Sequence, residues 1–322
     1  MSFQILGTGS FVPERVVTNE ELSQMVDTSD EWIVKRIGVR KRRVCTSETV
    51  TDLGVEAARR ALADAGVKPE KLDLIIAATI SADTISPGLG GMVQNRLGAR
   101  CPAFDMNVAC PGFLFALDVA AGFFARKAVK KVLVVSAERM SGLMDWEDRA
   151  TCCIFGDGAG AVVLGEGDAY LASELHTQGG DDIISIPVKW DNSPFYQREL
   201  PKNKVNMEGQ ATYKFAVTSM VSDIKSVLEK AGITGEQVKA VIPHQANYRI
   251  INEARRRLPE IAPEKFLINI EEYGNTSSAS EPLLLDEARR KGMFQPGDYI
   301  LLSAFGGGLS SASCVVRWTK AK

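Results

Sequence analysis

The residue best suited to chemistry is Cys110, which stands in residues 107–112 directly before an apolar segment. Asp118 is the only charged residue between 113 and 125, so this segment predicts a helix that is apolar on nearly every side and lies inside the fold. Pro111 suits the first position of that helix, because its missing N–H would have no partner there. Unpaired N–H groups and the helix dipole favour an anion at a helix start, so a thiol there should ionise more readily to the nucleophilic thiolate. The alternative is a buried cysteine that acts as a small hydrophobe.

Polar residues and glycines in the second half complete the candidate chemistry. His244 follows a predicted strand at 240–242, and α/β sheets bind ligands at the carboxyl ends of their strands. The alternative is a core histidine that is hydrogen-bonded to the backbone, while His176 has no recognisable setting and is predicted to be structural or on the surface. Asn275 follows a glycine at a helix start, where it could also be an ordinary cap. Glycines 306–308 let backbone N–H groups approach an oxyanion, or they form only a flexible turn.

Composition excludes several classes of protein. The chain has 322 residues, of which 45% are hydrophobic and 24% charged, which is typical of one large duplicated domain or two globular domains. A net charge of −2 argues against nucleic-acid binding, and the longest apolar run is too short for a membrane span. Six cysteines form neither a disulfide scaffold nor two CxxC pairs for zinc, and the first residues lack the basic region of a signal peptide. We therefore expect a cytoplasmic enzyme with reduced cysteines and no metal.

Strands and helices alternate along the chain, which predicts an α/β fold with a mainly parallel sheet. A glycine cluster at 156–158 is not a phosphate loop, because an apolar strand follows it where a helix would be needed. The predicted strands are 3–8, 72–79, 103–106, 131–136, 152–156, 159–165, 240–242 and 299–304, and the predicted longer helices are 50–65, 88–97, 113–125 and 282–290.

The second half of the chain repeats the first. Segments 61–72 and 132–137 recur as 227–238 and 299–304, at offsets of 166 and 167 residues. Two matches at a nearly constant offset of half the chain indicate an internal duplication. The same offset carries Cys110 onto Thr276, beside Asn275. Two similar halves related by a pseudo-dyad would bring these two helix starts together at the centre.

Six short motifs are distributed along almost the whole chain: DTSDEWIVKR at 27–36, NVACPG at 107–112, FGDGAG at 155–160, HQAN at 244–247, YGNT at 273–276 and FGGGL at 305–309. With these motifs the chain resembles the β-ketoacyl-acyl-carrier-protein synthase III family of the thiolase-like superfamily. The resemblance implies a five-layered αβαβα fold and a homodimer. Its duplicated halves would be residues 1–168, with the nucleophilic cysteine, and residues 169–322, with the histidine and asparagine.

The resemblance also implies an activity, the decarboxylative Claisen condensation that starts fatty-acid synthesis. An acyl-CoA primer would form an acyl-Cys intermediate and then react with malonyl-acyl carrier protein to give 3-oxoacyl-acyl carrier protein. Coenzyme A would thus be part of a substrate, and no cofactor or metal is expected. The partners would be these two substrates and a second copy of the chain, with no nucleic acid or membrane.

Site roles follow from the matching positions. Cys110 would be the nucleophile, and His244 and Asn275 would donate hydrogen bonds to the enolate left when carbon dioxide departs. Backbone N–H groups of Cys110 and of Gly306 or Gly307 would hold the oxyanion. The resemblance further implies coenzyme A contacts at Thr28, Trp32, Arg36, Arg149 and Asn247, carrier-protein contacts at Lys214, Arg249, Arg255 and Arg256, and acyl-pocket walls at Ser86 and Phe305. Without the resemblance, the basic residues indicate only a solvated helix face.

Three positions depart from the family pattern and put the acyl substrate in question. Residues 310–312 replace a small-Trp-Gly stretch, Glu281 stands where an apolar residue is usual, and Ser86 replaces a phenylalanine that many members carry. We expect Glu281 to have a partner or to face solvent, because a buried carboxylate is otherwise costly. A related acyltransferase of specialised metabolism with another acceptor is the nearest alternative. A non-catalytic scaffold is disfavoured by Cys110, and a cysteine protease by the duplicated α/β chain.

Overall fold

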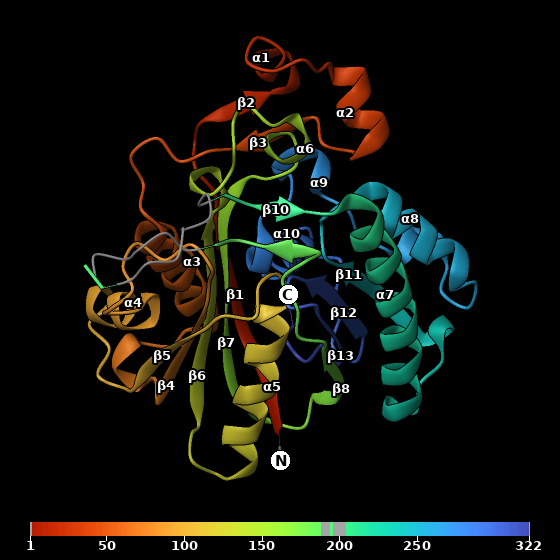
Figure 1. Cartoon of the computed structure of the whole chain (residues 1–322). Helices are drawn as coiled ribbons and strands as arrows, with labels where there is room; N and C mark the ends of the chain where they lie inside the picture. Colours follow the sequence, from red (N-terminus) through yellow and green to blue (C-terminus); the bar gives the residue numbers. More distant parts are fainter. Residues whose placement is uncertain (1, 188–193, 196–203, 322) are drawn as a thin grey trace.

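Two β-sheets lie side by side with a layer of helices between them (Figure 1). The structure is a computed structural model that describes residues 2–187, 194–195 and 204–321. The first sheet has the order β1 (Ser2–Phe11), β7 (Asp157–Gly167), β6 (Lys131–Arg139), β4 (Leu74–Ala78) and β5 (Ala103–Met106). The second has the order β8 (Tyr170–Thr177), β13 (Ser310–Arg317), β12 (Tyr299–Gly306) and β11 (Val238–Pro243).

The two sheets repeat one topology, which confirms the duplication. In the first, β1 and β7 are antiparallel, β7 and β6 are antiparallel, and β6 and β4 are parallel. In the second, β8, β13, β12 and β11 follow in the same sequence of orientations. The expectation of a mainly parallel sheet was wrong, because β7 and β13 each return antiparallel beside the preceding strand. Such a return needs no crossover helix, so strand–helix alternation alone does not reveal it.

Helices cover both outer faces and fill the middle layer, which gives five layers. One outer helix packs very closely on β1 of the first sheet. A side chain at Gly7 or Gly9 of β1 would collide with the backbone of that helix. This helix spans the predicted residues 50–65: it follows a capping box at Thr49, which was not predicted, and ends at Gly66. The outer helices are α3 (Val50–Ala65) and α4 (Leu89–Leu97) on the first sheet and α7 (Gly209–Ala231) and α8 (Tyr248–Arg257) on the second, and the inner ones are α5 (Gly112–Ala125) and α10 (Ser280–Arg290).

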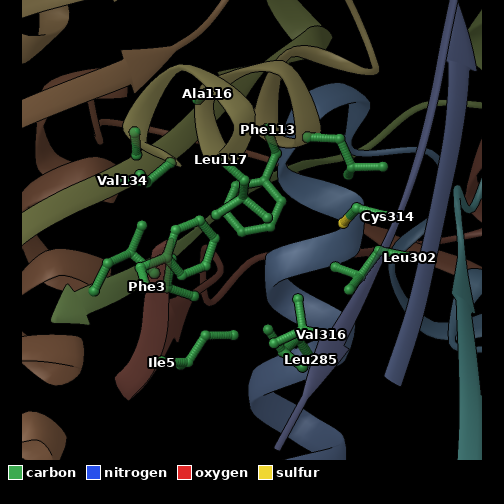
Figure 2. Packing of buried hydrophobic residues seen from close by; sticks show 14 of the residues in the cluster. Phe3, Ile5, Phe113, Ala116, Leu117, Val134, Leu285, Leu302, Cys314 and Val316 are labelled. Atoms are coloured by element: carbon green, nitrogen blue, oxygen red, sulfur yellow. The ribbon is translucent and has the colours of Figure 1, made fainter. Parts of the chain in front are cut away.

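Helix α5 is the predicted central helix, with two differences. It begins at Gly112, and Pro111 is the residue that caps it rather than its first residue. Phe113 and Leu117 point into the core between the sheets (Figure 2), but Phe115 and Phe123 on the other side stay partly exposed in the single chain. Burial on nearly every side is therefore wrong for the isolated chain, and one apolar flank of α5 remains available.

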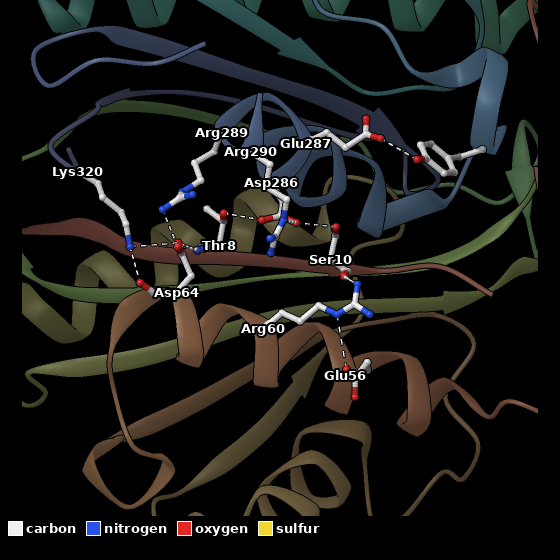
Figure 3. A network of polar contacts seen from close by, with 11 residues as sticks. Thr8, Ser10, Glu56, Arg60, Asp64, Asp286, Glu287, Arg289, Arg290 and Lys320 are labelled. Carbon is white, nitrogen blue, oxygen red and sulfur yellow. Dashed lines mark hydrogen bonds and ion pairs between the residues drawn. The ribbon is translucent and has the colours of Figure 1, made fainter. Parts of the chain in front are cut away.

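Helix α10 is tied to the first sheet by a buried carboxylate (Figure 3). Asp286, which has no exposed surface, accepts hydrogen bonds from the hydroxyls of Thr8 and Ser10, each at 2.7 Å. Arg290 pairs with the same carboxylate at 2.8 Å, one helical turn further on. Charged groups that are hydrogen-bonded in this way hold their element in one position. The second turn of α10 is thus fixed relative to β1.

The strand expected at residues 152–156 is not present. Cys152 ends a short helix, and Phe155 makes only an isolated bridge to Asn275 before β7 begins at Asp157. Apolar residues in a tight buried turn look like a buried strand in the sequence, because both lack polar positions. The remaining elements are α1 (Asn19–Leu22), α2 (Asp30–Arg36), α6 (Arg149–Cys152), α9 (Ile270–Tyr273), β2 (Val16–Thr18), β3 (Lys41–Arg43), β9 (Ile184–Ser185) and β10 (Asn206–Met207). Among the described residues, no helix combines the length and apolar character that a membrane crossing needs.

Candidate active site

Cys110 lies half-buried in a strained turn before α5. The preceding residue, Ala109, has a φ of 49°, a left-handed conformation that is costly for alanine and typical of functional sites. Gly306, at the end of β12, packs directly on the cysteine: a Cβ at 306 would lie 2.9 Å from the Cβ and the backbone N of Cys110. Gly307 lies next to Ala109. The structure therefore brings together the three backbone positions predicted to hold an oxyanion.

His244 follows β11 and is almost completely buried, with 1% of its surface exposed. Its backbone N–H donates to the carbonyl of Ser303 at 2.8 Å, which fixes the residue beside β12. The ring stands edge-on to Phe305, with centroids 5.3 Å apart and an interplanar angle of 80°. Phe305, predicted as an acyl-pocket wall, thus lies against the histidine. The second predicted catalytic side chain is held by the strand ends of the second sheet.

Glu281, in the first turn of α10, is the partner of His244. Its Oε1 lies 3.1 Å from Nδ1 of the ring, and the carboxylate has no exposed surface. Burial raises the pKa of Glu281, and the His244 charge opposes that rise. Burial lowers the pKa of His244, but the charges of Cys110 and Glu281 outweigh it and raise the pKa overall. The expected partner of Glu281 is therefore present, deep in the site rather than at its surface.

Asn275 is buried in a turn that crosses from one half of the chain to the other. Its backbone N–H donates to the carbonyl of Ile154 at 2.9 Å, and its carbonyl accepts from Gly156 at 3.0 Å. Gly274 makes this turn possible, because a Cβ there would lie 2.7 Å from the Ile154 carbonyl oxygen. The side-chain Oδ1 accepts the N–H of Ser277 at 2.8 Å. That bond orients the amide, so that Nδ2 is the end that remains to donate to a ligand.

Glu138, at the end of β6, is a site residue that sequence reasoning missed. It is fully buried and accepts hydrogen bonds from the hydroxyls of Ser277 and Ser278 at 3.2 and 2.7 Å. The hydroxyl of Ser81 and the N–H of Ile80 bind the same carboxylate at 2.6 and 3.1 Å. Burial raises the pKa of Glu138, while these hydrogen bonds oppose the rise. One carboxylate thus joins the Asn275 turn to the strand ends of the first sheet.

The residues expected to contact coenzyme A form one group beyond this core, in which Arg36 and Arg149 are exposed and the other three are partly buried. The guanidinium carbons of Arg36 and Arg149 lie 5.2 and 5.1 Å from the ring centre of Trp32. Asn247 caps α8, and its amide donates to the Arg36 carbonyl at 3.2 Å. Thr28 lies near the Cys153 thiol in the same region. A flat aromatic ring between two guanidinium groups can stack a planar base and bind phosphates.

The four residues expected to face the carrier protein differ in exposure and in their contacts within the chain. Lys214 and Arg249 are exposed, and Arg249 lies over the ring of Tyr213 at 5.8 Å. Arg256 is also exposed but pairs with Glu253 at 2.8 Å. Arg255 is only partly exposed, and it donates to the Phe266 carbonyl at 2.7 Å. Arg255 therefore has a structural contact that its sequence position did not reveal.

Three other positions lie outside the catalytic cluster. Ser86 is in an exposed loop after β4, and among the described residues no hydrogen bond joins it to Cys110. Residues 310–312 belong to β13 and pair with β12 and β8. His176 on β8 is largely exposed, and its ring lies 3.1 Å from Glu174, in agreement with the surface role predicted for it.

Comparisons with known proteins identify the family of the chain. Residues 104–179 match the family model "3-Oxoacyl-[acyl-carrier-protein (ACP)] synthase III", and residues 228–318 match the model of its C-terminal part. A β-ketoacyl-[acyl-carrier-protein] synthase III of Clostridium acetobutylicum is 45% identical over 99% of both chains. The 3-oxoacyl-[acyl-carrier-protein] synthase III structure from Aquifex aeolicus has a TM-score of 0.92 and 43% identity, covering 98% of this chain and 100% of that one. The priming β-ketosynthase of the R1128 polyketide pathway has a TM-score of 0.93 and 35% identity, covering 100% and 97%.

Proposed function

This chain belongs to the 3-oxoacyl-[acyl-carrier-protein] synthase III family, and from that premise we propose how its residues divide the reaction. The protein is an acyltransferase that carries out the condensation starting fatty-acid synthesis. We propose acyl-CoA and malonyl-acyl carrier protein as its substrates, and no resident cofactor or metal. Residues 1–168 would supply the nucleophile, and residues 169–322 would supply the two hydrogen-bond donors.

The first step is acyl transfer to Cys110. The thiolate attacks the thioester carbonyl of acyl-CoA, and the resulting oxyanion accepts hydrogen bonds from backbone N–H groups of Cys110 and of Gly306 or Gly307. The C–S bond to coenzyme A then breaks, and the coenzyme leaves as its thiol after it gains a proton. The packing of Gly306 on Cys110 supports this step, since no side chain separates the two backbones there.

Decarboxylation of the malonyl group follows. His244 and Asn275 donate hydrogen bonds to the thioester carbonyl oxygen, and the bond to the carboxylate carbon breaks to release carbon dioxide. The electron pair remains as an enolate, whose carbon attacks the acyl-Cys carbonyl. The tetrahedral intermediate then collapses, the Cys110 thiolate leaves, and 3-oxoacyl-acyl carrier protein is released. The Ser277 bond to Oδ1 supports the donor role of Asn275.

The observation that carries the proposal is that Gly306 packs directly on Cys110, although the two lie far apart in the sequence, and the Cys110 charge also raises the pKa of the buried His244. The direct test incubates the purified protein with a set of isotope-labelled acyl-CoAs and digests it for mass spectrometry. We expect one acyl group on the peptide that contains Cys110, and its release as 3-oxoacyl product when malonyl-acyl carrier protein is added. Acylation at another cysteine, or none with any acyl-CoA, would contradict the proposal.

A second candidate is a related acyltransferase that hands the acyl group to another acceptor. Glu281 beside His244 favours it, because the resemblance to the family implies an apolar residue at this buried position. The similarity to the R1128 priming β-ketosynthase keeps this candidate relevant. The same labelled acyl-enzyme decides between the two. Turnover with malonyl-acyl carrier protein supports fatty-acid initiation, whereas a stable acyl-enzyme in its presence supports the alternative.

We also propose that the enzyme is a cytoplasmic homodimer. Strand β5 lies at the edge of the first sheet, where Phe104 is 36% exposed, and nearby Ile85 is 71% exposed. The partly exposed flank of α5 lies in the same half of the chain. Apolar side chains beside an unpaired strand edge are typical of a surface that another chain covers. The carrier protein would approach the basic side chains of Lys214, Arg249 and Arg256, since it is acidic.

Substitution of Ser86 tests the acyl pocket. In the proposed dimer, Ser86 of the partner subunit would close the pocket that begins at Cys110, and the small serine leaves room for several methylene groups. Each buried methylene stabilises binding by about 0.8 kcal/mol, so medium-length or branched acyl-CoAs should acylate Cys110 at least as well as acetyl-CoA. Ser86→Phe should reverse this preference, so that acetyl-CoA acylates Cys110 about tenfold better than longer acyl-CoAs. The cause would be overpacking of the pocket rather than altered chemistry.

Competition between acyl-CoAs, read by the mass on Cys110, measures this order. Ser86→Ala is the matched control, because it removes the hydroxyl without filling the space and should keep the wild-type order. Leu89 is already buried and packed, so it should not move into the gap. A strong preference for acetyl-CoA that does not respond to Ser86→Phe would contradict the prediction.

A further inference from the structure

Glu281 and His244 form a buried pair of titratable side chains. Nδ1 of the ring lies 3.1 Å from Oε1 of the carboxylate, and the two side chains are 1% and 0% exposed. Among the described residues, Nδ1 and Oε1 meet as an ion pair without hydrogen-bond alignment, and neither Oε2 of Glu281 nor Nε2 of His244 has a hydrogen-bond partner. Water does not screen either group, so the net charge of the pair determines its free energy.

The net charge of the pair limits its protonation states. With a net charge of −1 or +1, it would carry an uncompensated charge in the interior, which is strongly unfavourable. Two neutral states remain: imidazolium with carboxylate, and imidazole with carboxylic acid. The first places one proton between Nδ1 and Oε1 and a second proton on Nε2, and so does the second when the acid proton lies on Oε1. In both of these arrangements the pair is a hydrogen-bond donor at Nε2.

We propose that Glu281 is a positioning residue that shares the Nδ1 proton of His244 and so keeps Nε2 a donor to the malonyl thioester. The proposal rests on the function proposed above, in which His244 stabilises the enolate. Without the carboxylate, a neutral histidine can carry its single proton on either nitrogen, and the form with a bare Nε2 cannot donate. Glu281 lowers the population of that form around neutral pH.

The charges around the pair act in the same direction. The pKa of His244 is raised by Cys110 and Glu281 against the effect of burial, and burial raises the pKa of Glu281, so both groups retain protons to higher pH. Cys110 and Cys314 are the other titratable groups that face the pair. Burial raises the pKa of Cys314, so this thiol stays neutral. The donor is thus present below the raised pKa of the pair and is lost as the pH rises through it.

The scaffold holds Glu281 in place for this role. It is in the first turn of α10, where the helix dipole stabilises a carboxylate. One turn further on, the buried Asp286 fixes the same helix to Thr8 and Ser10 (Figure 3). A carboxylate on a fixed helix can set the orientation of the ring as well as its protonation. Both effects act through His244, not on the substrate.

The test measures carbon dioxide release from malonyl-acyl carrier protein in a single turnover, with Cys110 already acylated so that its thiol cannot titrate. The wild type should lose this activity at high pH, when the pair becomes carboxylate and imidazole with a bare Nε2. Glu281→Gln should keep the rate within about threefold near pH 7.5, because its amide can donate to Nδ1, but the high-pH loss should disappear. Glu281→Leu should lower the rate about tenfold, change the half-saturating substrate concentration less than twofold, and also lack the high-pH loss.

Two measurements separate positioning from a structural role. Glu281→Leu removes a buried charge, so the melting temperature should stay the same or rise, whereas a structural contact would make it fall. In a His176→Gln background, His244 is the only histidine, and its ¹⁵N spectrum should show a protonated Nε2 around neutral pH. If Glu281→Leu does not fold, the pH profile of Glu281→Gln decides alone.

The outcomes distinguish this inference from the proposed function. If the unsubstituted enzyme forms no acyl-Cys and releases no carbon dioxide, the proposed function is wrong. If it does both, but the Glu281 variants keep the wild-type rate and the wild-type loss at high pH, only the inference about Glu281 is overturned. A high-pH loss that disappears in both variants supports it.

Discussion

Cys110→Ala is expected to abolish acyl-enzyme formation and to lower condensation by on the order of 10³-fold or more. The substitution removes the sulfur that carries the acyl group and leaves the His244 and Asn275 donors in place. Cys110 is only half-buried and lies in the turn before α5, so the alanine should leave the fold intact. Intact-protein mass after incubation with acyl-CoA measures the first effect, and 3-oxoacyl product measures the second.

Cys45→Ala is the matched control, because Cys45 is the other thiol that is not fully buried. Burial raises the pKa of Cys45, and the Asp157 charge raises it further, so this thiol should stay protonated and unreactive. Its removal should leave acylation unchanged. Cys110→Ala protein that still takes up an acyl group, with an unchanged melting temperature, would show that the nucleophile is elsewhere.

Loss of either donor should produce the second large effect. His244→Ala or Asn275→Ala should lower malonyl decarboxylation by about 10²-fold or more, because each removes one hydrogen bond to the developing enolate. Acyl transfer to Cys110 should fall much less, since the oxyanion of that step is proposed to be held by backbone groups. Separate rates for acyl transfer and for carbon dioxide release test this division.

Asn275→Ala has a side effect that the structure identifies. It leaves the buried N–H of Ser277 without its acceptor, which should cost about 1–3 kcal/mol of stability. Asn275→Asp avoids this, because a carboxylate still accepts that bond while the donor is lost. His176→Ala is the matched control for His244, since it removes the exposed histidine. Equal losses in both half-reactions would count against separate roles.

Much of the fold follows from local sequence signals. Thr49 and Gly66 delimit α3 because a capping box and a left-handed glycine act within one turn of the helix. The duplication is visible because equivalent strands need similar apolar runs at a constant offset. The positions of Cys110 and His244, at a helix start and a strand end, follow for the same reason. These features depend on neighbours in the sequence.

The rest depends on contacts between distant segments. Glu138 and Glu281 are ordinary charged residues in the sequence, and nothing near them indicates that both are completely buried. Their partners, Ser278 and His244, come from elements that meet only after both sheets have formed. The prediction of a strand at residues 152–156 was wrong for a related reason. The backbone hydrogen bonds of this segment go to the Asn275 turn rather than to a strand. Hydrophobic pattern predicts that a segment is buried, but not what it will touch.

The Glu138 contact has a consequence for the newly made chain. Ser278 is synthesised 140 residues after Glu138, which at about 5–20 residues per second is a delay of roughly 7–28 s. Until then the strand ends around Cys110 have no Asn275 turn to join them, and the carboxylate of Glu138 lacks two of its hydrogen-bond donors. A chain released early would therefore contain the nucleophile without the groups that direct it. Ribosome-bound intermediates of this protein should not catalyse the condensation, and this activity should arise in one late step of folding.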